Sequence, residues 1–372
     1  MTGALSIGLV CEQLLAPIPG GIGTYVRGLL RALPQNGVGV IPHVAWHRKD
    51  DVAQAGLEGA RRLPLPRRAL YEGWSRFGRP TFGLEGDVVH APSLAFPSPL
   101  RRPLVVTVHD VLFLEFPETF PAHGLAFHRR ALSRVADADL VICPSRATAA
   151  ALESIEAPPE RVRVVPLGAD VVPPEDPARV LDAVGIDRPY VLWVGTMEPR
   201  KNLRRAIGGF LRAAESHAPG AGHLKLYLAG PTGWLSGPVS ELLTRSDVRD
   251  RVRPLGVLPT ERLAAAYAGA ETFLFPSLGE GFGLPVLEAM AAGAPVVTSD
   301  RSSLPEVAGD AAVLCDPTDE DSIASALVSI LADPSLAQRL RERGRARAAE
   351  FTWERTARET AACYREVAGE TA

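Results

Sequence analysis

The chain has 372 residues, 46% of them hydrophobic and 22% charged, which suits two packed cores better than one. A formal charge of -3 and a pI near 6.3 exclude a global positive field that would gather nucleic acid. No apolar run reaches the roughly 18–20 residues of a spanning helix, and the first residues lack a secretory signal. We therefore expect a cytosolic, two-domain protein.

The cysteines Cys11, Cys143, Cys315 and Cys363 lie far apart, with no CxxC pair among them. This spacing fits neither a metal site nor a disulfide framework. The sequence predicts that all of them are reduced thiols in the core.

In the first half of the chain, short apolar runs alternate with helical patterns, which is the βαβ rhythm of a parallel sheet. The predicted strands are Ser6–Val10, Val38–Val44, Val88–His90, Leu104–Val108, Leu140–Cys143 and Val162–Val165. The predicted helices include Thr24–Leu33, Gly124–Ala136 and Ala147–Ser154. These elements make up a first doubly wound domain over residues 1–172.

A proline-rich stretch, Pro173–Pro177, cannot join a helix or sheet interior and is predicted to be an interdomain linker. The rhythm then restarts and predicts a second doubly wound domain over residues 178–350. Its strands are Tyr190–Val194, Leu224–Ala229, Val252–Leu255, Thr272–Phe275, Pro295–Thr298 and Ala312–Cys315. Its helices include Leu203–Ser216, Thr260–Ala268 and Leu284–Ala292. Residues 351–372 have a helical apolar period that would suit a last helix returning to the first domain.

Glycines follow the first predicted strand, in Gly20–Tyr25, and lead into a helix. Glycines at such a junction let backbone N–H groups approach a phosphate at the positive end of the helix. The same glycines could serve tight packing alone. The spacing is not that of a dinucleotide fingerprint, because Gly-x-Gly-x-x-Gly is absent.

The strand Leu104–Val108 runs directly into His109 and Asp110. Side chains at the carboxyl end of a strand in an open α/β sheet sit where ligands bind, which makes His109 a candidate site residue. The alternative is a histidine that hydrogen-bonds locally to Asp110 or to the backbone. His90, at the end of the preceding strand, could line an acceptor pocket.

Two cations, Arg200 and Lys201, stand where a helix is about to begin, in the run Gly195–Asn202. Positive charges there oppose the helix dipole unless a negative group lies between them. A bound diphosphate would supply that group. The alternative is an Arg-Lys pair solvated at the surface.

The most informative segment is Phe275–Met290, in which a strand ends, a glycine-rich turn follows and a helix begins at Pro285. The turn offers free backbone N–H groups to a sugar or phosphate. Glu280 in the turn and Glu288 on the helix offer carboxylates, which accept hydrogen bonds from the vicinal hydroxyls of ribose and hexose.

Three further patterns predict roles outside the chemistry. Ser303 and Glu306 read as a capping box, and Ser145 as an N-cap. The stretch Arg61–Arg79 mixes arginines with aromatic residues, which suits either a helix that packs its aromatics inward or contact with a membrane surface.

Taken together, these motifs resemble the family 4 retaining glycosyltransferases over nearly the whole chain, from Gly20 to Trp353, and most specifically in the Glu-x7-Glu pair Glu280 and Glu288. The resemblance implies the GT-B fold: two Rossmann-like domains that face each other across a cleft, with a C-terminal helix that returns to the first. It also implies a glycosyltransferase that needs no metal and no cofactor and that uses a nucleotide-diphosphate sugar as co-substrate.

The resemblance assigns a role to each matching residue of the donor site. Glu288 would hold the donor ribose, Glu280 and His109 the transferred hexose, and Lys201 the diphosphate. Backbone groups complete the donor site at Gly21, Gly23, Phe282, Gly283 and Leu284, and those of the loop Gly256, Val257 and Leu258 would read the nucleobase.

The chain departs from the family pattern at Thr196, where many members carry a phosphate-binding arginine. The second positive charge must then come from Arg200 or be missing. The run Gly195–Asn202 is similar to a subgroup rich in mannosyltransferases, which favours GDP-mannose as the donor, with a UDP-sugar next.

The sequence thus predicts transfer of a hexose, with retention of configuration, to a hydroxyl of a glycan, glycolipid or small molecule, with contact to the inner face of a membrane through Arg61–Arg79 as an option. Alternatives on the same fold are a nucleotide-sugar 2-epimerase, a sugar phosphorylase or a non-catalytic binding partner. A nicotinamide oxidoreductase is a weaker option, since two Rossmann-like domains do not specify a function.

Overall fold

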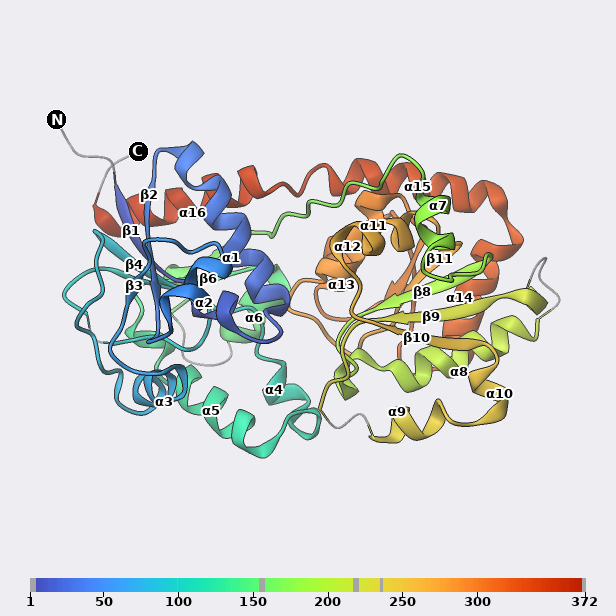
Figure 1. Cartoon of the computed structure of the whole chain (residues 1–372), viewed down its shortest axis with the longest axis horizontal. Helices are drawn as coiled ribbons and strands as arrows, with labels where there is room; N and C mark the ends of the chain where they lie inside the picture. Colours follow the sequence, from blue (N-terminus) through green and yellow to red (C-terminus); the bar gives the residue numbers. More distant parts are fainter. Residues whose placement is uncertain (1–4, 99, 154–157, 217–220, 235–236, 370–372) are drawn as a thin grey trace. The chain divides into compact units, whose positions relative to one another are not determined.

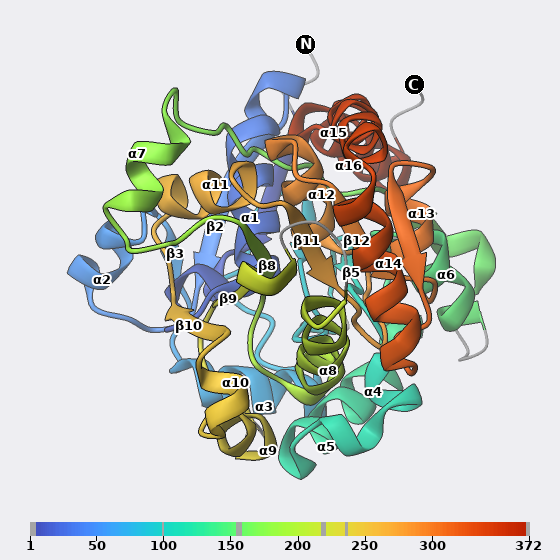
Figure 2. The same cartoon turned by 90° about the vertical axis from the view of Figure 1, so that its right-hand side faces the viewer.

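The computed structural model describes residues 5–98, 100–153, 158–216, 221–234 and 237–369 (Figures 1 and 2). The chain divides into two compact units. The first comprises Met1–Glu115, Ala122–Gly168 and Thr352–Ala372, and the second comprises Phe116–Pro121 and Ala169–Phe351. The sequence predicted the linker at residues 173–177, but the boundary between the units falls between Gly168 and Ala169. The helix α7 (Pro177–Asp182) begins at the last residue of the predicted linker.

The first unit is built on a seven-stranded sheet in the order β3-β2-β1-β4-β5-β6-β7, and every neighbouring pair in it is parallel. The strands are β1 (Ser6–Val10), β2 (Gly39–Val44), β3 (Arg61–Arg62), β4 (Val88–Ala91), β5 (Leu104–Thr107), β6 (Leu140–Cys143) and β7 (Val162–Val164). Strands β4, β5 and β6 are buried throughout, as their continuous apolar runs predict for a sheet covered on both faces. The strand order reverses between β1 and β4, the position where ligands bind in doubly wound sheets.

Helices connect the strands of the first unit. They are α1 (Gly20–Ala32), α2 (Lys49–Gln54), α3 (Arg67–Phe77), α4 (Leu112–Glu115), α5 (Ala122–Leu132), α6 (Arg146–Glu153) and α16 (Trp353–Ala368), with short 3-10 turns η1 (Glu12–Leu15), η2 (Pro34–Asn36), η4 (Val135–Asp137) and η5 (Pro159–Arg161). The Arg-rich stretch is therefore an edge strand followed by a helix, because Arg61 and Arg62 pair with β2 through their backbone. On α3 the aromatic Trp74 is buried while Phe77 is exposed.

The last helix, α16, packs against α1 within the first unit (Figure 1). Trp353 fills the contact, and a side chain larger than hydrogen at Gly28 would collide with its indole ring. Thr352 caps the helix by accepting a hydrogen bond from Arg355 N at 3.1 Å. Gly28 thus leaves the space that the indole ring of Trp353 occupies between α1 and α16.

A buried polar chain links α16 to the sheet. His90 Nδ1 lies 2.7 Å from the Tyr364 hydroxyl, and His90 Nε2 lies 2.8 Å from Thr107 Oγ1. Tyr25 of α1 joins the same threonine at 3.1 Å. His90 has no exposed surface, so the reading of His90 as part of an acceptor pocket is wrong. Burial lowers the pKa of His90 to about 3, which keeps its imidazole neutral.

The second unit is built on a six-stranded parallel sheet in the order β10-β9-β8-β11-β12-β13. The strands are β8 (Tyr190–Val194), β9 (Lys225–Ala229), β10 (Val252–Gly256), β11 (Thr272–Phe275), β12 (Val296–Ser299) and β13 (Ala312–Cys315). Each agrees with a predicted strand to within one residue at either end. The prediction of two doubly wound α/β units is therefore confirmed.

The helices of the second unit are α7, α8 (Leu203–Ala214), α9 (Gly237–Leu242), α10 (Ser246–Arg249), α11 (Thr260–Ala268), α12 (Leu284–Ala292), α13 (Leu304–Ala308), α14 (Glu320–Ala332) and α15 (Pro334–Ala348), with 3-10 turns η3 (Pro117–Thr119), η6 (Pro199–Lys201) and η7 (Ala221–His223). Helix α14 lies alongside α8, and α15 packs on α12 (Figure 2). Trp234 holds Phe116–Pro121 in this unit, since its Nε1 donates to Thr119 O at 2.7 Å.

The structure also bears on the predictions about the cysteines and about membrane-spanning helices. The four cysteines are free and buried, as predicted. In the part of the chain that the structure describes, the helices are all too short or too polar to cross a bilayer.

Candidate functional site

The turn after β8 carries the two cations, and side chains from a distant segment lock it in place. Asn202 adopts a left-handed backbone conformation with φ of 56°. Its side-chain amide donates to Pro276 O at 2.9 Å and to Pro317 O at 2.6 Å. Leu278 N in turn donates to Arg200 O at 2.9 Å. The cationic turn and the turn after β11 therefore form one rigid assembly.

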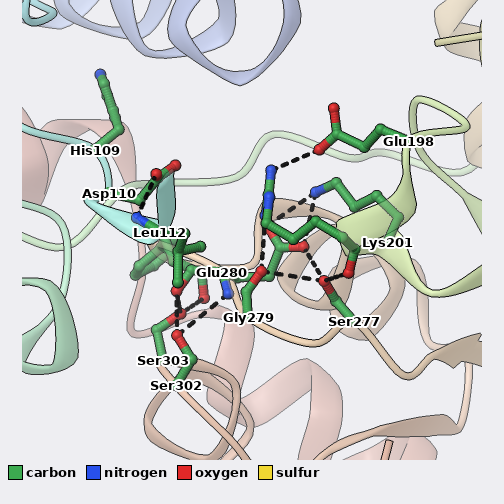
Figure 3. Close-up of polar contacts among 12 residues, drawn as sticks. His109, Asp110, Leu112, Glu198, Lys201, Ser277, Gly279, Glu280, Ser302 and Ser303 are labelled. Atoms are coloured by element: carbon green, nitrogen blue, oxygen red, sulfur yellow. Dashed lines mark hydrogen bonds and ion pairs between the residues drawn. The ribbon is translucent and has the colours of Figure 1, made fainter. Parts of the chain in front are cut away.

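Glu280 lies at the centre of this assembly (Figure 3). Its two carboxylate oxygens each accept from Lys201 Nζ at 2.8 Å, and Oε1 also accepts from Ser277 Oγ at 2.6 Å. Arg200 NH1 lies 3.1 Å from Oε2. Burial favours a raised pKa for Glu280, but the charges of Lys201 and Arg200 outweigh burial and hold the pKa at about 2.

Arg200 is held from three directions. Its guanidinium donates to Glu198 at 2.7 Å and to Gly279 O at 2.7 Å, besides its contact with Glu280. Glu198 is buried, so this pair is well shielded from water. Arg200 thus links the two turns as well as carrying a charge.

These contacts change one inference from the sequence. The negative group that the adjacent cations require is present within the chain, because Glu198 and Glu280 neutralise Arg200 and Lys201. The helix α8 also begins only at Leu203, after η6, so the cations precede it. A diphosphate is therefore not needed to explain the Arg-Lys pair in this structure.

Two serines from the segment before α13 hold the backbone at Glu280 (Figure 3). Ser302 Oγ donates to Glu280 O at 2.6 Å, and Ser303 Oγ donates to Glu280 O and to Phe282 O, both at 2.8 Å. The capping-box interpretation of Ser303 is wrong: the residue precedes α13, but its side chain makes no capping hydrogen bond. Its hydroxyl bonds to carbonyls of the glycine turn and not to the first N–H groups of α13.

Helix α12 begins directly after the glycine turn. Gly283 is its N-cap with φ of 109°, in the left-handed region, and a Cβ there would lie 2.7 Å from Leu304. Glycine is therefore required by conformation and by space. The first N–H groups of a helix have no partner within the helix, so the backbone near Phe282, Gly283 and Leu284 presents donors and a positive dipole end.

Glu288 lies one turn into α12 and pairs with a tyrosine of α11. Tyr267 donates its hydroxyl to Glu288 Oε2 at 3.0 Å, and the tyrosine itself is fully buried. Burial raises the pKa of Glu288 to about 7, although the bond from Tyr267 opposes the rise. Near neutral pH this carboxyl is therefore divided between its protonated and ionised forms.

The raised pKa gives a prediction for Glu288→Gln. A folded-state pKa near 7, above the ordinary 4.5, means that ionised Glu288 destabilises the fold, with the full cost present above pH 7 and none below about pH 4.5. Glutamine cannot ionise, so the thermal midpoint of the variant should exceed that of the wild type at pH 8, and the difference should shrink as the pH falls to 5. Calorimetry at several pH values measures this. Parallel curves for the two proteins would contradict it.

The predicted residues of the first unit lie at the ends of α1 and β5. Gly21 and Gly23 are not in a loop, as the sequence suggested, but in the first turn of α1, which begins at Gly20. His109 follows β5, hydrogen-bonds through Nε2 to Pro92 O at 3.0 Å and meets the edge of Tyr25 at 5.1 Å. Burial lowers the pKa of His109, so its ring is neutral. Ser145 accepts from Thr148 N at 3.1 Å, which confirms it as an N-cap.

The remaining predicted positions lie at strand ends of the second unit. Thr196 follows β8, and its carbonyl accepts from Glu198 N at 2.8 Å. Gly256 ends β10 with φ of 68°, Val257 is well exposed, and Leu258 is half-buried. Among the described residues no group of three or more His, Cys, Asp or Glu side chains is placed to hold a metal ion. Metal-independent activity stays a prediction.

Sequence reasoning missed Glu198, Tyr267, Ser277 and Ser302 as members of the site. Glu198 stands two positions before Arg200, and an acidic residue beside a cation pair was the available signal. Tyr267 and Ser302 are separated from their partners by 21 and 22 positions and gave no local signal.

Family models match both halves of the chain. Residues 188–333 match the family model described as Glycosyl transferases group 1, and residues 19–172 match that described as Glycosyltransferase Family 4. The chain is 35% identical over 286 residues to the O-antigen chain mannosyltransferase B of Escherichia coli, covering 75% of this chain and 74% of that protein. It is 28% identical to the phosphatidyl-myo-inositol mannosyltransferase of Mycolicibacterium smegmatis, covering 98% and 95% of the two chains.

Solved structures show the same fold at lower identity. Sucrose-phosphate synthase from Thermosynechococcus elongatus superposes with a TM-score of 0.75 at 23% identity, covering 99% of this chain and 100% of that one. Anabaena HepE in complex with UDP and glucose superposes with a TM-score of 0.72 at 20% identity, covering 96% and 98%.

Proposed function

The chain belongs to glycosyltransferase family 4 and has its two-domain GT-B fold, and from this premise we propose that it transfers a hexose from a nucleotide-diphosphate sugar to a hydroxyl acceptor with retention of configuration. GDP-mannose is the leading donor, because similar proteins are named mannosyltransferases. A UDP-sugar comes next, because a structure of similar fold holds UDP and glucose.

One observation carries this proposal: Lys201, Arg200 and Glu280 converge in a buried cluster beside the start of α12. Breaking the anomeric bond leaves negative charge on the diphosphate and positive charge on the sugar ring. Cations and backbone donors fixed in advance stabilise such developing charge without reorganisation. We assign Lys201 and the N–H groups of Phe282, Gly283 and Leu284 to the departing diphosphate.

The second cation is Arg200, which would take the place of the arginine missing at Thr196. For Arg200 to meet a phosphate, its guanidinium must share donors that now serve Glu198 and Gly279 O. We further assign Glu288 to the ribose, Glu280 and His109 to the hexose and Gly256–Leu258 to the base. The N–H group of Gly21 would also serve the diphosphate, whereas Gly23 N donates to Pro19 O at 3.1 Å within the same turn of α1.

We infer same-face attack as the route to retention. The bond from the anomeric carbon to the phosphate oxygen breaks, the acceptor oxygen bonds to the same face of that carbon, and the acceptor proton passes to the leaving phosphate oxygen. A covalent route would need a free carboxylate nucleophile. Glu280 is held by Lys201, Arg200 and Ser277, which argues against that role.

The acceptor is a hydroxyl of a glycan, glycolipid or small molecule. A membrane-borne acceptor is compatible with α3 and the residues after it, where Phe77 and Phe82 are exposed beside Arg76 and Arg79. Aromatic and basic residues together favour the interface of an anionic membrane. The first unit would then rest on the inner face of the membrane.

The donor is tested by thermal shift with GDP-mannose, UDP-glucose, ADP-glucose and dTDP-glucose. A donor at 100 times its dissociation constant should add about 2.7 kcal/mol of stability. We expect GDP-mannose to give the largest shift, and EDTA to leave both the shift and the rate of nucleotide release unchanged. Loss of turnover in EDTA would refute metal independence.

Assays of the protein with the same nucleotide sugars distinguish the alternative functions. A 2-epimerase would convert the nucleotide sugar with no acceptor present, and a phosphorylase would need inorganic phosphate. A binding partner without chemistry would show the thermal shift but no turnover with any acceptor. Absence of binding by every nucleotide sugar would refute the proposed function itself.

A further inference from the structure

The first unit contains a second polar cluster that the donor chemistry does not use. It is centred on Glu12, the first residue of the 3-10 turn η1 that follows β1, and it includes His47 and Arg67. The exposed indole of Trp46 stands beside His47 in the segment that follows β2. Strands β1 and β2 are neighbours, and β1 borders the reversal in strand order (Figure 1). Carboxyl ends of strands near such a reversal are where open α/β sheets bind ligands.

Glu12 is a buried carboxylate that orders the groups around it. Its side chain has no exposed surface. Oε2 accepts from Ala45 N at 2.8 Å, and Oε1 lies 2.8 Å from His47 Nε2 and 4.0 Å from Arg67 Nε. Burying a carboxylate is costly unless it is paired and hydrogen-bonded, and the contacts with Ala45, His47 and Arg67 meet that requirement.

His47 and Arg67 are anchored at one end and exposed at the other. Their side chains keep 22% and 32% of their surface, respectively. Arg67 lies over the ring of Tyr71 at 5.5 Å and donates to Gln13 Oε1 at 3.3 Å. Arg62 holds the backbone of the same segment by donating to His47 O at 3.2 Å. The imidazole and the guanidinium are therefore presented in fixed positions.

Trp46 gives this cluster an apolar platform. It is 58% exposed, although its backbone is fixed by a hydrogen bond from Trp46 N to Leu65 O at 2.8 Å. Large aromatic residues usually bury most of their surface, and an indole on a fixed backbone beside polar groups suits a ligand with one apolar face and polar edges. A pyranose ring has that character: C–H groups cover its faces, and hydroxyls project from its edge.

We propose that Trp46, His47 and Arg67 form the acceptor subsite, in which the terminal sugar ring of a saccharide acceptor packs on Trp46 and its hydroxyls hydrogen-bond to His47 and Arg67. Glu12 acts as a positioning residue that fixes the imidazole and the guanidinium. This inference rests on the proposed glycosyltransferase function and names the class of acceptor: a saccharide, recognised by its terminal ring.

The test is saturation-transfer NMR on the full chain, with GDP or UDP present, whichever stabilises the protein more. The probes are the methyl α-glycosides of mannose, glucose, galactose, rhamnose and N-acetylglucosamine. We expect saturation of the ring protons of at least one glycoside, weakened about fivefold or more in Trp46→Ala. Leu314→Ala is the control, because Leu314 is an apolar side chain 40% exposed in the second unit, outside the cluster, and its replacement should leave the signal unchanged.

A second variant, Glu12→Gln, tests the positioning role. It keeps the shape of the side chain but loses its charge, so the same glycoside should bind more weakly while nucleotide binding stays at the wild-type level. Saturation of the nucleotide with no saturation of any glycoside would overturn the proposal and leave the proposed function intact. So would a glycoside signal that persists in Trp46→Ala. If neither nucleotide receives saturation, the proposed function fails first.

Discussion

Replacement of Lys201 with alanine is expected to lower kcat/KM by about 10²–10³-fold, the usual cost of removing one fixed donor to a developing negative charge. Lys201 Nζ is held 2.8 Å from both oxygens of Glu280, and its ammonium lies over the ring of Phe275 at 5.2 Å. The ammonium is therefore fixed in place before the donor arrives. Alanine removes the charge at the point where the diphosphate would depart.

The fold should survive this change. Glu280 keeps its contacts with Arg200 at 3.1 Å and with Ser277 at 2.6 Å, so its carboxylate remains paired. The measurement is the initial rate of nucleotide release at varied donor concentration, with circular dichroism as the check on folding. Lys225→Ala is the matched control, because Lys225 forms an ion pair with Asp187 near the surface of the same unit. A wild-type rate in Lys201→Ala would count decisively against the assigned site.

Most helices and strands of this chain could be predicted from its sequence. Strands such as Tyr190–Val194 and Thr272–Phe275 agree with prediction to the residue, because a short apolar run bounded by turn residues describes a buried parallel strand well. Strand β3 was missed, since Arg61 and Arg62 pair through their backbone at a sheet edge and carry no apolar signal. The start of α1 was placed late because its first turn is rich in glycine.

For the candidate site, the sequence predicted the residues but not their contacts. A local motif identifies Glu280 and Glu288, but it does not say what their carboxylates contact. Lys201 and Glu280 are 79 positions apart, and their pairing depends on two turns brought together by the sheet. Ser303 is a second example. Its local sequence pattern predicted a helix cap, but its hydroxyl donates to the carbonyl of Glu280, which is 23 positions away in the sequence.

Replacement of Glu280 with alanine is expected to be the most destabilising change at the site. It leaves Lys201 without its carboxylate partner, and the side chain of Lys201 is only 13% exposed. Removing one partner of a buried ion pair costs about 3–5 kcal/mol because the other charge stays buried. Arg200 keeps Glu198, so we expect about 3 kcal/mol, the low end of that range. For a unit of this size, that is a fall of about 6–12 °C in the thermal midpoint.

A double variant separates the orphaned charge from other effects of the substitution. If the buried cation of Lys201 causes the loss of stability, the double variant Lys201→Ala, Glu280→Ala should have a higher thermal midpoint than Glu280→Ala, although it removes more side-chain atoms.

The pH dependence of stability supplies an independent check. The pKa of Glu280 is held at about 2, below its ordinary value of 4.5, so its stabilisation is complete above pH 4.5 and is lost as the pH falls towards 2. The calorimetric gap between wild type and Glu280→Ala should therefore narrow on acidification. A double variant less stable than Glu280→Ala, or a gap that does not change with pH, would mean that Glu280 supports the fold through packing and not through its charge.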